Sequence, residues 1–242
     1  MKTIKPYEGI TLEFNEANHR FLVNGEPTVS VTSVTGIIDK SAPLIYWAVG
    51  LSRDYLLELL NGGIEIQKGH ILEAANQHRA VKEKAGTIGD AVHEFAEQFA
   101  LGLKPEIPEQ ENARNGALAF LKWVDESGMK LSNAEQLVYS KKYDYAGIAD
   151  AEAVKGKKRY VVDFKTSKGI YNEMRYQVSA YLSALQEMNR KNYAGYWILR
   201  FDKETGNFDP LFVDAKEALL DFQAFLGALK IKRREQQLKN GK

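Results

Sequence analysis

The chain has 242 residues, of which 44% are hydrophobic and 27% charged, as in an ordinary globular protein. It has no cysteine, which excludes disulfides, thiolate catalysis, Cys-ligated zinc and Cys-held iron–sulfur clusters. The formal net charge of +1 gives no global attraction to nucleic acid, so a polyanionic partner must be held by a local patch or by a metal ion. No signal-peptide pattern and no long apolar run occurs, so we expect neither a secreted nor a membrane-spanning protein.

The N-terminal region predicts short extended segments. Ile10–Phe14 and Arg20–Val23 flank the turn-rich sequence NEANH and predict a small hairpin. Val29–Val34 predicts a further extended piece.

The first half of the chain then predicts four helices in order: one from Ser41 to a stop at Asn61-Gly62-Gly63, one over residues 65–84, one that starts at residue 87, and one over residues 109–126. Ser41 and Thr87 are the expected N-caps of the first and third of these. Gly62 and Gly128 are the expected stops of the first and last.

The second half predicts strands over residues 134–141, 193–201 and 208–213 and a helix over residues 170–188. Asp214 and Glu217 form a capping-box pattern that predicts a terminal helix. We expect the basic end of this helix, KIKRREQQLKNGK, to fray, and a basic run of this kind is more often a solvated tail than a DNA grip.

Between these segments the sequence predicts a β-hairpin. One strand is expected over Ala146–Val154 and the return strand over Lys158–Lys165. Gly156-Lys157 suits a two-residue type II′ turn, because glycine accepts the positive φ at its first position. This loop length fixes the register of the two strands.

In that register Asp150 lies opposite Asp163, so both side chains point to the same face. Lys165 is two residues past Asp163 and joins that face. Two adjacent carboxylates repel unless they share a proton or a cation. An ion pair of Lys165 with one aspartate leaves the other unexplained, so the pattern favours a divalent metal site, and oxygen ligands favour Mg²⁺.

With the DFK at 163–165, a helix-borne His93 and the spacing Gln177-x₃-Tyr181, the order of elements from about residue 87 to 201 resembles the PD-(D/E)XK nuclease superfamily. More narrowly it is similar to the RecB-like and phage exonuclease group. The segment HRFLVNGEPTVSVTSV is also similar to the N-terminal part of phage members.

The resemblance implies an α/β fold with a restriction-endonuclease-like core, αβββαβ, in which a mixed central sheet is flanked by helices. An N-terminal hairpin and helical wall (residues 1–85) would pack on the nuclease core and C-terminal helix (residues 86–242) as one compact domain. Several relatives hold an iron–sulfur cluster with four cysteines; this chain has none and is similar to the cluster-free members.

The resemblance also implies site roles. Asp150, Asp163, the Phe164 carbonyl and His93 would bind Mg²⁺ or Mn²⁺, and Lys165 would orient or deprotonate the attacking water. The remaining implied residues are Gln177 and Tyr181 as positioning groups within the catalytic set, Glu135 as a supporting acid, and Thr166, Ser167 and Lys168 as contacts to a nucleic-acid phosphate. From the residues alone, Gln177 could instead lie on a helix surface, and Tyr181 and His93 could be packed core residues.

We therefore expect a metal-dependent DNA exonuclease that prefers single strands or free ends and acts in phage or bacterial recombination, repair or processing. Its implied location is the cytoplasm (the bacterial host's if phage-encoded), and a recombinase or a single-strand-binding protein is a further implied partner. The alternatives are a structure-selective endonuclease on the same site, and a DNA-binding recombination partner without turnover.

Overall fold

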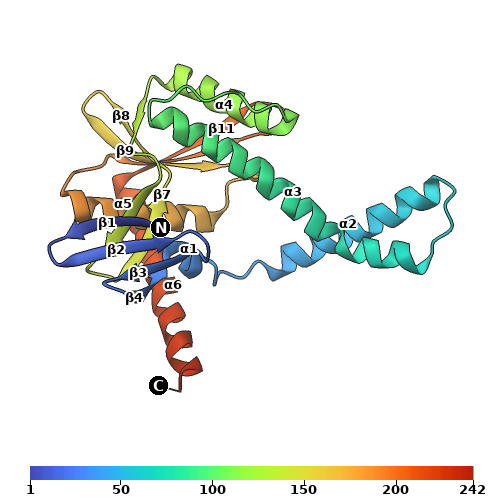
Figure 1. The fold of residues 1–242 in the computed structure, drawn as a ribbon, viewed down its shortest axis with the longest axis horizontal. Coiled ribbons are helices and arrows are strands. Elements are labelled where there is room, and N and C mark those ends of the chain that lie inside the picture. The colour runs from blue at the N-terminus through green and yellow to red at the C-terminus, as the bar shows by residue number, and fades with distance from the viewer. Residues whose placement is uncertain (242) are drawn as a thin grey trace. The chain divides into compact units, whose positions relative to one another are not determined.

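The computed structural model describes residues 1–241 (Figure 1). These residues form six helices and eleven strands, and the strands make up two mixed sheets. The strands are β1 Lys2–Tyr7, β2 Ile10–Asn15, β3 Arg20–Val23, β4 Glu26–Ser30, β5 Lys130–Ser132, β6 Gln136–Ser140, β7 Tyr145–Ala149, β8 Ala151–Lys155, β9 Lys158–Lys165, β10 Gly195–Phe201 and β11 Phe208–Asp214. The helices are α1 Val31–Thr35, α2 Ser41–Asn61, α3 Lys68–Ala100, α4 Glu111–Ser127, α5 Asn172–Asn189 and α6 Ala215–Lys239. The predicted α/β class is confirmed. None of the helices within residues 1–241 is both long and apolar enough to cross a membrane.

The strands divide into two sheets where the sequence predicted one. The six-stranded sheet has the order β1-β2-β3-β4-β7-β6, and the five-stranded sheet has the order β11-β10-β9-β8-β5. Only β4–β7 and β9–β10 are parallel pairs among the described strands. The predicted strand Ala146–Val154 is wrong as a single element, because it breaks at Asp150 into β7 and β8, which belong to different sheets.

The turn and register of the predicted hairpin are confirmed for its distal part. Lys155 pairs with Lys158 and Ala151 with Val162, which is the register that brings residues 150 and 163 opposite one another. Gly156 has φ +60°, whereas Lys157 is not among the described residues with positive φ, and this combination is the type II′ pattern.

Several local predictions in the first half are wrong. Of the predicted extended piece Val29–Val34, only Val29 and Ser30 are extended, at the end of β4. Ser30 then caps the short helix α1, and its hydroxyl accepts the Ser33 N–H at 3.1 Å. Thr87 does not start a helix, because α3 runs without a break from Lys68 and the Thr87 hydroxyl donates to the Glu83 carbonyl.

Two other helix predictions need correction, the cap at Ser41 and the frayed basic end of the terminal helix. Ser41 lies inside α2, and its N–H is capped instead by the Asp39 carboxylate at 2.8 Å. No residue of α2 is buried, although its apolar residues recur at helical spacing. The basic C-terminal run does not fray from Lys230, since α6 continues to Lys239.

The described chain has two units. The first joins Met1–Ile38 with the chain from Val92 onward, and the second is Asp39–Ala91. The N-terminal strands thus group with the later strands, and this division does not coincide with the predicted one at residues 85/86. Within the second unit, the Ser52 hydroxyl of α2 donates to the Ala74 carbonyl of α3 at 2.7 Å.

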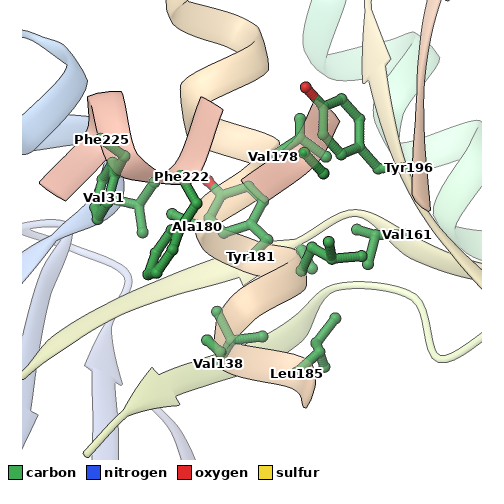
Figure 2. Packing of buried hydrophobic residues seen from close by; sticks show 14 of the residues in the cluster. Val31, Val138, Val161, Val178, Ala180, Tyr181, Leu185, Tyr196, Phe222 and Phe225 are labelled. Atoms are coloured by element: carbon green, nitrogen blue, oxygen red, sulfur yellow. The ribbon is translucent and has the colours of Figure 1, made fainter. Parts of the chain in front are cut away.

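Helix α5 connects β9 to its parallel partner β10 and packs on strands of both sheets. Figure 2 shows its side chains packed with residues of β6, β9, β10 and α6 in the main hydrophobic core. The labelled members of this cluster are Val31, Val138, Val161, Val178, Ala180, Tyr181, Leu185, Tyr196, Phe222 and Phe225. The core therefore fixes α5 against both sheets near the point where the chain passes from one to the other.

Gly147 of β7 lies directly beneath the Tyr181 ring of α5. A Cβ atom there would lie 2.6 Å from Cε1 of Tyr181 and 3.1 Å from Cγ2 of Val31. We predict that Gly147→Ala lowers the free energy of unfolding by about 1–3 kcal/mol, because the buried ring has little room to move. Urea unfolding measures this change.

Gly227→Ala in α6 is the matched control, because a Cβ at Gly227 meets nothing within 4 Å. It should stabilise the protein by up to about 1 kcal/mol through helix propensity. Equal effects of the two substitutions would contradict the close contact at Gly147.

Candidate active site

The site lies at the carboxyl end of β9, beside the break between β7 and β8. Asp150 occupies that break, and its Oδ2 accepts the backbone N–H of Phe164 at 2.7 Å. Asp163 is fully buried, and its Oδ2 lies 2.5 Å from Nζ of Lys165. The structure thus brings together the two aspartates and the lysine that the sequence pattern selected.

The alternation of β9 sends its side chains to two different surroundings. Val161, on the same face as Asp163 and Lys165, belongs to the core cluster around α5. Phe164 points the other way, and its ring packs edge-on against Phe120 of α4 with centroids 5.5 Å apart. This anchored phenylalanine holds the β9 backbone at the position where its N–H meets Asp150.

The electrostatics of the site are dominated by burial. Burial raises the pKa of Asp163 to about 6, an effect that Lys165 opposes and the Asp150 carboxylate reinforces. Burial also raises the pKa of Asp150, while Lys165 and the Phe164 N–H oppose that rise. Burial lowers the pKa of Lys165, but Asp163 and Asp150 outweigh it, so its pKa is raised overall and the ammonium form is favoured.

His93 of α3 reaches the same site. Its Nδ1 lies 3.7 Å from Oδ2 of Asp150, and its ring packs edge-on against Phe164 with centroids 6.2 Å apart. One third of its side chain is exposed to solvent. The histidine is therefore both packed and in contact with a candidate ligand.

Gln177 and Tyr181 form a pair on α5. The Gln177 side-chain amide donates to the Tyr181 hydroxyl at 2.9 Å. The Tyr181 ring lies in the core (Figure 2). The pKa of the Tyr181 hydroxyl is raised, first by burial and then by the negative charge of Asp163. Tyr181 thus has the packing of a core residue, and the charge of Asp163 acts on its hydroxyl.

Glu135 is not on a strand as predicted; it has φ +49° and precedes β6. Its backbone N–H donates to the Asp150 carbonyl at 2.9 Å, and its carboxylate binds Nζ of Lys2 at 2.9 Å. Burial and the charge of Glu135 raise the pKa of Glu97, one turn after His93 on α3.

Sequence reasoning did not select Lys2 or Glu97 for the site. The His93-x₃-Glu97 spacing could have suggested Glu97, whereas no signal in the sequence pointed to Lys2.

Thr166, Ser167 and Lys168 follow β9 directly. They line a cavity of about 240 Å³ together with residues of the loop after β10. The Ser167 hydroxyl donates to the Gly169 carbonyl at 2.8 Å, which fixes the turn.

The two aspartates offer oxygen ligands of the kind that a divalent metal requires. Within residues 1–241, no group of three or more His, Cys, Asp or Glu side chains is placed to hold a metal ion. Oδ1 of Asp163, however, is buried without a hydrogen-bond partner in the described structure. Mg²⁺ commonly uses one or two carboxylates and several waters, so Asp150 and Asp163 with an unsatisfied oxygen fit such an ion.

No protein-family model matches the chain, and no curated protein sequence matches it. Among solved structures, an alkaline exonuclease from Laribacter hongkongensis is similar over 88% of this chain and 93% of that chain, with 12% identity and a TM-score of 0.39.

The buried Asp163 makes the stability of the metal-free protein pH-dependent. Its raised pKa means that, between about pH 4 and pH 6, the native state holds a proton that the unfolded chain has released. This contribution to stability is fully present below about pH 4 and is lost as the pH rises through about 6. We predict a loss on the order of 1–3 kcal/mol from this residue across that range, measured by urea unfolding in EDTA.

Asp163→Asn is the control, because asparagine does not titrate. The variant should lose less stability than the wild type between about pH 4 and pH 7. Parallel pH profiles of the two proteins would contradict the raised pKa of Asp163.

Proposed function

We propose that the protein is a metal-dependent deoxyribonuclease that hydrolyses phosphodiester bonds of DNA from free ends, with a preference for single strands. The observation that carries this proposal is the convergence of Asp150, Asp163 and Lys165 at the carboxyl end of β9. A structural ion pair would account for Lys165 and one oxygen of Asp163, but it leaves the buried Oδ1 of Asp163 unsatisfied. The restriction-endonuclease-like core belongs to the same proposal.

In this proposal Asp150 and Asp163 would hold the metal, and the Phe164 carbonyl and His93 would serve as further ligands. Mg²⁺ or Mn²⁺, when bound, lowers the pKa of a water molecule and neutralises charge on the scissile phosphate. The hydrogen bond from Phe164 N–H and the contact with His93 restrict the Asp150 carboxylate to one orientation.

Lys165 acts mainly as a cation in this scheme. Its raised pKa favours the ammonium form in the chain alone, and an ammonium cannot accept a proton from water. It is therefore better suited to orient the water and to offset phosphate charge than to act as the general base.

Gln177 and Tyr181 are positioning residues. The Tyr181 hydroxyl accepts a hydrogen bond from Gln177, so its own proton remains available for a group in the site. Glu135 supports Asp150 through its backbone N–H.

We predict that Asp150→Ala, Asp163→Ala and Lys165→Ala each lower the cleavage rate of linear single-stranded DNA by at least about 10²-fold, because the first two would each remove a metal ligand and the third the cation that offsets phosphate charge. EDTA should abolish cleavage, and Mn²⁺ or Mg²⁺ should restore it. The measurement is a gel assay with end-labelled oligonucleotides.

Asp125→Ala and Lys157→Ala are matched controls for loss of a carboxylate and of an ammonium group, because both residues are exposed. They should cleave like the wild type. Metal-dependent activity that survives Asp163→Ala would refute the site.

Closed circular single-stranded DNA tests the exonuclease assignment, because a circle has no end from which to begin. It should persist while a linear strand of the same sequence is degraded. Cutting of the circle would show endonuclease action at the same site.

A further inference from the structure

The cavity beyond the site, which we name the loop cavity, lies between Thr166–Lys168 after β9 and Arg200–Glu204 at the end of β10. Lys165 of β9 and Arg200 of β10 are paired in parallel strands. The residues that follow each strand therefore lie at the same edge of the five-stranded sheet. The cavity volume of about 240 Å³ is below the roughly 300–1,000 Å³ of pockets that enclose whole small molecules. It suits a single small group.

The charged residues of the loop cavity are not equally available to a ligand. Arg200 is already bound by Asp202 at 3.1 Å and by Asp209 at 2.9 Å. Lys168 and Lys203, in contrast, have no carboxylate within ion-pair distance among residues 1–241. The pKa of Lys203 is lowered, first by burial and also by the positive charge of Lys168, although Glu204 opposes this.

The loop that carries Lys203 is rigidly held. The Asn112 and Asn115 side-chain amides of α4 donate to the Lys203 carbonyl at 3.0 and 3.3 Å. Oδ1 of Asp202 accepts the N–H groups of Glu204 and Thr205 at 2.9 and 3.0 Å. These contacts fix the backbone and leave the Lys203 side chain to the cavity, so the loop is organised before any ligand binds.

Two ammonium groups without ion pairs, the hydroxyl of Thr166, and a pre-organised loop together form an anion site of the size of one phosphate. The site follows directly on Lys165, where the scissile phosphate is proposed to lie. We propose that the loop cavity binds a backbone phosphate of the DNA strand next to the cleaved one, with Lys203 as its main cation. This inference rests on the proposed nuclease function and adds a subsite built from β10 and its following loop.

The test is binding of an end-labelled single-stranded DNA oligonucleotide in EDTA, where no metal-dependent cleavage occurs. Lys203→Gln should weaken binding by about 3- to 10-fold at low salt, and the slope of log K against log salt should become shallower by about 0.7, as for one lost phosphate contact. Lys203→Arg should retain most of the affinity, because it keeps the charge. Thermal unfolding checks that each variant is folded.

Lys157→Gln is the matched control, because this exposed lysine lies at the opposite end of β9 from Lys165. It should bind like the wild type. The subsite would be overturned if the Lys203→Gln protein bound the oligonucleotide as tightly as the Lys157→Gln protein does. It would also be overturned if the wild-type protein bound no oligonucleotide.

A second experiment tests, without changing any charge, whether the hydrogen bonds that hold the Lys203 loop contribute to DNA binding. Asn112→Ala with Asn115→Ala removes both amide contacts to the Lys203 carbonyl and should weaken oligonucleotide binding less than Lys203→Gln does. Unchanged binding would contradict the claim that the loop is pre-organised for the strand.

The cleavage assay separates failure of the subsite from failure of the proposed function. If the wild type cleaves no DNA but Lys203→Gln weakens binding, the nuclease assignment fails and the subsite stands. If the wild type cleaves DNA and Lys203→Gln matches the control in both binding and KM, the subsite fails and the nuclease assignment stands.

Discussion

The hydrogen bond from the Phe164 N–H to the Asp150 carboxylate is the interaction on which the site depends. It forms where the chain leaves the six-stranded sheet and enters the five-stranded one, so it joins the end of β7 to the end of β9. An aspartate side chain that accepts a backbone N–H competes with regular strand pairing, which gives a physical reason for the break at this residue. The same bond orients the carboxylate beside Asp163 and Lys165.

Burying the charged groups of the site lowers the stability of the fold, and the packing of the surrounding side chains offsets this loss. Asp163 is enclosed by strands and by α5, and only one of its oxygens has a partner in Lys165. The aromatic side chains Phe120 and Phe164 on one face and Tyr181 on the other hold the backbone on both sides of the carboxylates. A polar group kept in such surroundings at a cost in stability is typical of a functional site.

The sequence predicted the local parts of this structure better than their assembly. The β8–β9 turn followed from Gly156-Lys157, and the spacing between Asp150, Asp163 and Lys165 followed from the turn. The division into two sheets did not follow, because strand periodicity is the same on both sides of Asp150. The residue type of Thr87 suits an N-cap, but a threonine hydroxyl can equally bond to the preceding turn of a helix, as it does with the Glu83 carbonyl.

Long-range contacts account for the residues that sequence reasoning missed. Lys2 reaches Glu135 across most of the chain's length, and Lys203 enters the loop cavity through the parallel pairing of β9 with β10. Neither the Lys2–Glu135 ion pair nor the position of Lys203 produces a regular residue spacing in the sequence. His93 was found only through the family resemblance, since one helical histidine with a glutamate a turn later is common in proteins.

The pairing of β4 with β7 has a consequence for how the protein is made. Val29 and Ser30 lie beside Tyr145 and Ala146, so the first four strands reach their sheet partner only after more than half of the chain has been synthesised. Until then the ribosome-bound chain carries an open strand edge, which is a surface prone to aggregation. The six-stranded sheet can be completed only once β6 and β7 have been made, and pairing across such a separation is intrinsically slow.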